Sequence, residues 1–386
     1  MNKKLSMAVA GAVMAFGASA ANAGITIPAG DWTIDIGGNV NAFYTRTNAD
    51  GPLQTNGDDV QNIRTGLLPS AIGFGGKTRQ NDLDVAFQFT FFVGGDDGNG
   101  GLSGGGNSIN IRQAFLSFGD KSWGTIKAGR DLGIFGSDAI LSDMTLLGVG
   151  VGATGNGGSS TLGRIGSGYI YADWNGQISY ASPNWNGFSF AVGLRDNQGA
   201  NSGVDRNDKI GFEGKVNYDW TGDFSGKVWA GFITQKQEFA VAGPSDYTAR
   251  GFELGGKVAA GGFGLVAYGY DARGLDSNAT TALLGVGGIP FRTGGVKTDD
   301  KGGYLQGTFV IPGVGTKLGL SYGVSDSEQP GAGREVKNKS WIAGAYHPLT
   351  KSLNLVAEYT DGRLDTNLAA GNIDYDTVSL GAIMFF

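Results

Sequence analysis

The sequence predicts an all-β protein: a transmembrane antiparallel up-and-down β-barrel of 16 strands, with a long loop folded into the lumen. Three observations predict it. Apolar and polar residues alternate at period two along most of the chain, short turns alternate with long loops, and residues 378–386 form an alternating strand that ends on Phe386. Period two sends successive side chains to opposite faces of a sheet, so each strand has one apolar and one polar face.

The alternation is clear in the segments 34–44, 83–91, 188–194, 318–324 and 353–359. A soluble β-sandwich also alternates, but here the polar faces carry charges in mid-strand, which a packed sandwich core could not accept without partners. Low-complexity disorder is the other interpretation of a chain with 71 glycines. It fails because aromatic and branched residues recur regularly.

The connections between the predicted strands are of two kinds, and the two kinds alternate. Short turns are expected at 76–82, 119–123, 183–187, 220–223, 260–264, 311–315 and 347–352. Long polar stretches are expected at 48–61, 94–108, 131–169, 196–207, 240–246, 272–298, 326–335 and 362–372. These fifteen connections join sixteen strands, an even number that lets an antiparallel barrel close around a water-filled lumen.

The N-terminus has the pattern of a secretory signal peptide. Residues 1–23 contain Lys3 and Lys4, an apolar stretch at 8–21 and an Ala-Asn-Ala exit, so we expect a signal peptide at 1–23 and the barrel at 24–386. Without the two lysines, 27 basic side chains face 35 acidic ones, a net charge of −8. This acidic balance argues against nucleic acid as a partner, because nucleic-acid binding requires clustered Lys and Arg.

Composition excludes several other classes. The chain has 0 cysteines, so we expect neither a disulfide framework nor a thiolate metal site. After the predicted signal peptide, no segment approaches the ~18 consecutive apolar residues that a membrane-spanning helix needs.

Aromatic side chains gather near the short turns, as in the girdle that anchors a barrel at the headgroup boundary. The alternative is that aromatic residues simply favour strands. The residues expected at this level are Trp32, Trp123, Trp185, Trp220, Phe224, Phe263, Tyr346 and Phe386.

The longest connection, 131–169, is rich in glycine and carries many apolar residues. A connection of this length is usually functional or disordered. Folding it into the lumen would bury its apolar side chains and narrow a channel. Asp138 and Asp143 would then present carboxylates to the passage, and the alternative is that both are ordinary solvated loop residues.

Several motifs resemble the trimeric general diffusion porins of Gram-negative bacteria. Residues 111–118 (IRQAFLSF) and 123–130 (WGTIKAGR) resemble the strand-turn-strand before the pore loop of these porins. Residues 180–190 (YASPNWNGFSF) resemble the strand-turn-strand after it, 345–351 (AYHPLTK) the penultimate turn, and Phe386 the terminal aromatic. Each motif alone is weak, but their order and spacing are specific and cover nearly the whole chain.

This resemblance implies a homotrimer in the outer membrane that passes small hydrophilic solutes and ions by passive diffusion, with the bilayer and outer-membrane lipids as its surroundings. It also implies a pore constriction made of wall and loop charges, namely Arg112, Arg130, Asp138, Asp143 and Arg164. Two unit charges ~8 Å apart in water interact by only ~0.5 kcal/mol, so such charges would bias passage without holding a solute.

The sequence departs from the porin pattern at three places. Ala71 stands where a wall arginine is common, Asn39 stands where a lysine is expected, and the loop tip at 146–150 reads LLGVG. We therefore expect a weaker transverse field than in those porins. For Arg112 and Arg130 the alternative is a surface or subunit-contact position, although a lipid-facing arginine would cost roughly 2–4 kcal/mol.

No enzymatic, metal or cofactor site emerges from the sequence. The single histidine, His347, has no cysteine partners, and acidic pairs such as Asp299 and Asp300 are typical of solvated loops. The second functional hypothesis is a barrel that serves as an adhesin or structural scaffold through its extracellular loops.

Overall fold

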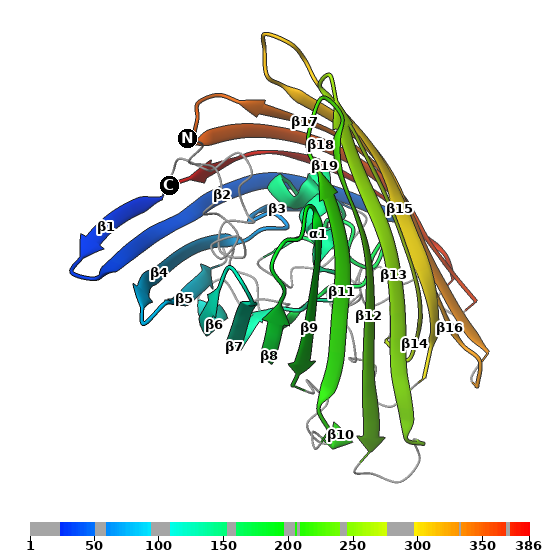
Figure 1. Cartoon of the computed structure of the whole chain (residues 1–386). Coiled ribbons are helices and arrows are strands. Elements are labelled where there is room, and N and C mark those ends of the chain that lie inside the picture. Colours follow the sequence, from blue (N-terminus) through cyan, green and yellow to red (C-terminus); the bar gives the residue numbers. More distant parts are fainter. Residues whose placement is uncertain are drawn as a thin grey trace.

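The computed structural model describes residues 24–50, 59–93, 109–152, 160–196, 205–206, 209–239, 245–275, 297–331, 333–367 and 371–386 (Figure 1). The expected signal peptide, 1–23, lies outside the described residues. The strands are β1 (Ile25–Ala29), β2 (Trp32–Asp50), β3 (Asp59–Arg64), β4 (Ser70–Gln80), β5 (Leu83–Val93), β6 (Ile109–Asp120), β7 (Gly124–Leu132), β8 (Trp174–Ala181), β9 (Phe188–Arg195), β10 (Asp205–Arg206), β11 (Gly211–Trp220), β12 (Ser225–Phe239), β13 (Tyr247–Ala260), β14 (Phe263–Arg273), β15 (Asp299–Val310), β16 (Lys317–Gln329), β17 (Arg334–Pro348), β18 (Leu353–Thr366) and β19 (Ile373–Phe385). The two helical segments are α1 (Ser137–Ser142) and the 3-10 turn η1 (Met144–Leu147).

Within the described ranges, sixteen of these strands form a closed antiparallel ring that runs from β2 through β4 to β9 and β11 to β19. The ring closes where β19 pairs with β2, from Asp374 opposite Asp50 to Phe385 opposite Asn39. Beyond this ladder Phe386 exchanges two main-chain hydrogen bonds with Gly38, at 2.9 and 3.1 Å. The predicted barrel of 16 strands is therefore confirmed.

Three short strands supplement the ring. β3 and β4 both pair with β2, so together they make one interrupted strand, and β10 pairs with the end of β12. β1 pairs with the first residues of β2 and forms an extra hairpin that the sequence did not predict. Its five residues are all exposed and include a proline, so it lacks the one-sided apolar pattern that identifies the other strands.

The seven predicted short turns all join consecutive strands of the ring. Two of them are two-residue hairpin loops in which both central residues have positive φ. These pairs are Asn81 with Asp82 (φ 47° and 62°) and Gly261 with Gly262 (φ 56° and 87°). Such turns match the twist of the flanking strands and favour Gly, Asn and Asp. Turn chemistry is local, which is why the sequence predicted these connections.

The two faces of the wall differ sharply in polarity. On β13, Phe252 and Leu254 are 63% and 67% exposed on the outer face, while Glu253 between them is 4% exposed on the inner face. The same alternation holds on β19, where Val378 and Leu380 face outward. An apolar exterior around a polar interior is the arrangement of a barrel surrounded by lipid. No helix among the described residues is long and apolar enough to cross a membrane.

The predicted aromatic girdle is only partly present. Trp123, Trp185, Phe224 and Phe263 are exposed near the short turns. Tyr346 was predicted at the same level, but this was wrong, because it is 2% exposed. It occupies an even-numbered position of β17, and even-numbered residues of that strand point inward. For Tyr346, the alternation along the strand predicts the direction of the side chain better than its nearness to a turn.

Substituting Leu254 by arginine tests whether the outer face lies in lipid. Leu254→Arg is expected to lower the free energy of unfolding by roughly 2–4 kcal/mol, because it places a charge on the apolar face in mid-strand. Leu254→Phe is the matched control and should change it little. Urea titration in lipid vesicles measures both. Equal stability of the two variants would contradict a lipid-facing position.

Candidate functional site

The connection between β7 and β8, residues 133–173, which we call the inserted segment, contacts the inner face of the wall. Its described parts are 133–152 and 160–173, and they contain α1 and η1. Figure 1 shows α1 within the curve of the sheet. Its contacts join it to strands far along the chain, from β11 to β18, so its position depends on non-local interactions.

Glu358 of β18 binds one end of this segment. Its Oε2 accepts hydrogen bonds from the main-chain N–H groups of Val149 (2.8 Å) and Gly150 (2.7 Å). Its Oε1 accepts one from the Tyr346 hydroxyl at 2.6 Å. Glu358 is 5% exposed. The two main-chain hydrogen bonds attach the η1 end of the segment to β18.

Two further glutamates bind the other end. Glu213 of β11 accepts hydrogen bonds from Ile134 N at 2.9 Å and Phe135 N at 3.2 Å. Glu253 of β13 accepts one from Gly136 N at 3.0 Å. Both side chains are buried. The N–H groups just before α1, which have no intrahelical acceptor, are thus satisfied by wall carboxylates.

Neutral side chains hold the middle of the segment. Gln306 of β15 accepts from Met144 N at 2.7 Å and donates to the carbonyl of Ser142 at 3.0 Å. The Tyr304 hydroxyl donates to the carbonyl of Ala139 at 2.8 Å. The inner wall therefore satisfies main-chain groups along α1 and η1 as a strand partner would in a sheet.

Asp138, predicted at the constriction, lies on α1 and is 5% exposed. It forms ion pairs with Lys215 of β11 at 2.6 Å and with Lys227 of β12. Burial raises the pKa of the Asp138 carboxyl, but the charges and hydrogen bonds of the two lysines outweigh this and hold the pKa well below its usual range. The carboxylate therefore remains ionised and attached to the wall.

Asp143 and Arg164 were also predicted at the constriction, and both are buried. One Asp143 oxygen caps η1 through Thr145 N (2.9 Å), and the other accepts from the Tyr169 hydroxyl (2.9 Å) and Arg164 N (3.2 Å). The Arg164 guanidinium donates to Ser321 Oγ at 2.6 Å. These two residues join the outgoing and returning halves of the segment to each other and to β16.

Arg112 points inward from a β-bulge. Between Thr90 and Phe91 the register of the β5–β6 ladder shifts, and Arg112 and the following Gln113 are both buried, at 7% and 1% exposure. A bulge inserts an extra residue and re-aims a side chain in this way. The Arg112 guanidinium lies 4.6 Å from the ring centroid of Phe92 and 5.9 Å from that of Trp174.

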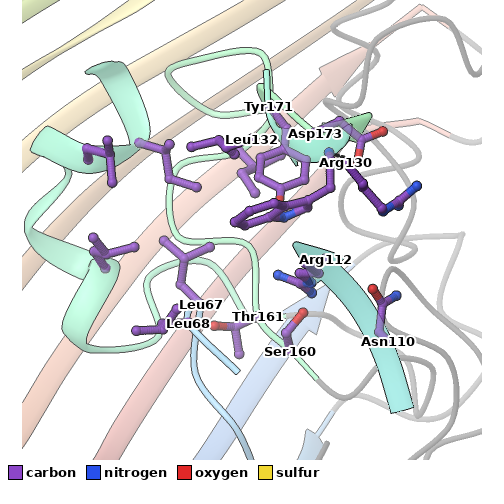
Figure 2. A pocket seen from close by; sticks show the side chains of 15 residues that line it. Leu67, Leu68, Asn110, Arg112, Arg130, Leu132, Ser160, Thr161, Tyr171 and Asp173 are labelled. Carbon is purple, nitrogen blue, oxygen red and sulfur yellow. Dashed lines mark hydrogen bonds between the residues drawn. The ribbon is translucent and has the colours of Figure 1, made fainter. Parts of the chain in front are cut away.

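The Arg130 side chain, from β7, also lies on the inner side of the wall, but for a different structural reason. Its backbone pairs with Ala114 and Gly176, and strict alternation would put its side chain on the outer face. Gly129 before it has φ +132°, which departs from regular strand geometry. The Arg130 side chain borders the inner cavity with Arg112 (Figure 2), and its Nε is buried without a hydrogen-bond partner.

This cavity lies between the wall and the inserted segment, is partly open, and has a volume of about 100 Å³. Its lining combines two arginines, several polar groups and an aliphatic surface. The residues are Leu67, Leu68, Asn110, Arg112, Arg130, Leu132, Ile140, Leu141, Leu146, Ser160, Thr161, Ile165, Tyr171, Asp173 and Trp174. Of the five predicted constriction residues, Arg112 and Arg130 both line this cavity, Asp138 and Arg164 contact the wall, and Asp143 binds groups of its own segment.

The wall residues that bind the segment, above all Glu213, Glu253 and Glu358, were not predicted from the sequence. A signal was present, because each carboxylate occupies an inward position within a strand, as in the Phe252-Glu253-Leu254 triplet. Such a position requires a partner. The sequence does not show that the partner is a main-chain amide more than 60 residues away, since 213 and 134 are 79 apart.

Comparisons with known proteins place these observations in a family. The family model described as Gram-negative porin matches residues 8–367. A comparison with curated protein sequences gives no match. The anion-selective porin from Comamonas acidovorans is 19% identical, with 92% of this chain and 100% of that chain covered and a TM-score of 0.65.

Two further solved structures share the fold. OmpF of Salmonella typhi, in complex with daunomycin, is 20% identical over 94% of this chain and 100% of that one, with a TM-score of 0.65. OmpT of Vibrio cholerae in its trimer form is 14% identical over 92% of this chain and 99% of that one, with a TM-score of 0.58. At these identities the likeness shows the fold, and the family model identifies the relationship. With nearly all of its length matched and its strands closed into a ring of sixteen, this chain belongs to the Gram-negative porin family.

Proposed function

We propose that the protein forms a water-filled channel in the outer membrane through which small hydrophilic solutes and ions diffuse passively. The observation that carries this is the closed ring of sixteen strands with an apolar outer and a polar inner face. A ring of this size is too wide for wall side chains alone to fill.

No enzymatic activity forms part of the proposal. The adhesin or scaffold alternative depends on long loops that lie mostly outside the described residues, and the family match does not favour it.

We further propose that segment 131–169 constricts the channel and that the five predicted residues serve the constriction in two ways. Arg112 and Arg130 supply its basic border, which their place in the cavity supports. Asp138 and Arg164 act by holding the segment against the wall and Asp143 by joining its two halves, which their buried ion pairs and hydrogen bonds support. The same wall contacts would resist displacement of the segment by solutes in transit.

The predicted homotrimer remains part of the proposal. The outer face of β4 and β5 carries stacked rings, with Phe74 5.4 Å from Phe89 and 6.0 Å from Phe91 between centroids. Ala42 of β2 and Ile72 of the adjacent strand β4 are also exposed. An exposed aromatic and aliphatic surface of this kind suits packing against another subunit. Export through a signal peptide at 1–23 is likewise proposed from the sequence pattern.

Electrical recording in a planar bilayer tests the channel function. The purified folded protein is expected to produce stepwise, ohmic current increments. Removing residues 140–160 is expected to raise the unit conductance, because it takes away part of the segment proposed to narrow the lumen. Heat-denatured protein serves as the control. Absence of stepwise current from folded protein would contradict the function, and unchanged conductance after the deletion would contradict the constriction.

The pH dependence of stability tests the attachment of α1. Asp138→Asn is expected to lower the free energy of unfolding by ~2 kcal/mol at pH 7, because it removes a charged acceptor from two lysines. Since the folded-state pKa of Asp138 is depressed, its stabilisation is complete above the unfolded value of about 3.9 and is lost as the pH falls through the folded value.

The difference between parent and variant should therefore stay constant from pH 7 to about pH 5 and shrink below about pH 3.9. Asp361→Asn, on the outer face of β18, is the matched control. Urea titrations across this range measure both variants. A difference that already shrinks between pH 7 and about pH 5 would contradict the depressed pKa.

A further inference from the structure

We propose that the cavity beside Arg112 and Arg130 is a subsite for short-chain carboxylate anions, with the arginines at the carboxylate and aliphatic side chains at the hydrocarbon end. The inference rests on the proposed channel function and names the solute class that its constriction favours. It follows from three properties of the cavity: its charge, the state of its arginines and its apolar surface.

The charge that borders the cavity is mainly positive because the acidic residues of the inserted segment face elsewhere. Asp138 is paired with Lys215 and Lys227, and Asp143 with groups of its own segment. Among the described lining residues, Asp173 is the one carboxylate, and its Oδ1 accepts a hydrogen bond from Trp174 N at 2.8 Å. The two guanidinium groups therefore outnumber the carboxylate, and an anion is favoured over a cation.

Arg112 can donate hydrogen bonds to an anion in the cavity, and Arg130 adds a second positive charge. Arg112 lies against the ring of Phe92, with its guanidinium carbon 4.6 Å from the ring centroid. Stacking occupies the face of a guanidinium and leaves its N–H edge for a planar acceptor, and a carboxylate fits that edge with two parallel hydrogen bonds. Arg130 also lines the cavity and adds a second positive charge to its border.

The rest of the cavity suits a hydrocarbon rather than a hydrated inorganic ion. Ile140, Leu141 and Leu146 of the inserted segment line it, together with Leu67 and Leu68 from the connection before β4. Its volume of about 100 Å³ is smaller than the ~150 Å³ of an engineered apolar cavity that holds benzene, so a short-chain acid is the size that fits. Transfer of such a chain from water to the aliphatic surface adds to its binding.

Block of the chloride current in planar bilayers tests this proposal with the full chain. Propionate is expected to reduce the current through the open channel at concentrations where propylammonium, a cation of the same length, does not. Arg112→Gln or Arg130→Gln should weaken the block by propionate roughly fivefold, the loss of one unit charge at close range in water. Lys301→Gln, on the outer face of β15, is the matched charge control and should leave it unchanged.

A second pair of measurements separates the apolar contact from the charge. Leu141→Asn should weaken the block by propionate roughly fourfold, which corresponds to about one buried methylene group, and leave the block by formate unchanged. Equal block by propylammonium, or an unchanged block in both arginine variants, would overturn the proposal. Equal weakening of the block by formate and of the block by propionate in Leu141→Asn would overturn the apolar part of the proposal.

A conducting channel without preference for propionate would contradict this inference alone, whereas absence of stepwise current would contradict the channel function as well.

Discussion

The hydrogen bonds from main-chain amides of the inserted segment to carboxylates of the inner wall are the interaction on which the rest of the structure depends. A segment of irregular backbone inside a barrel must find partners for its N–H groups, because leaving them unpaired in a buried position costs as much as a lost hydrogen bond. Glu213, Glu253 and Glu358 supply these partners from three strands around the ring. They bind the segment at both ends, so the wall determines the position of the segment.

This interaction also explains where the charges of the segment lie. Once the carboxylates of the wall are used on main-chain groups, the lysines of β11 and β12 are available to Asp138. Asp143 in turn joins the two halves of the segment through Thr145, Arg164 and Tyr169. Both acidic residues therefore stabilise the position of the segment, and aliphatic side chains border the cavity next to Arg112.

The fold was predictable from the sequence to a large extent because its determinants are local. Alternation along a strand and the chemistry of a two-residue turn such as Asn81-Asp82 involve neighbouring residues, and together they determined strand number and topology.

The candidate site was less predictable. The inward aim of Arg112 depends on a bulge against Thr90 and Phe91, and the partners of Asp138 lie on strands more than 75 residues away, since 215 and 138 are 77 apart. Tyr346 shows the same limit, because its inward position follows from strand register and not from its nearness to a turn.

Hydrogen exchange of individual main-chain amides in the folded protein tests the central claim most directly. The account predicts that the amides of Gly136, Val149 and Gly150 exchange as slowly as amides within the ladder of β13. Glu358→Ala should accelerate the exchange of Val149 and Gly150 and leave that of Gly136 slow, because Gly136 is bound by Glu253. Exchange of these three amides in the parent protein at the rate of an unstructured peptide would contradict the account.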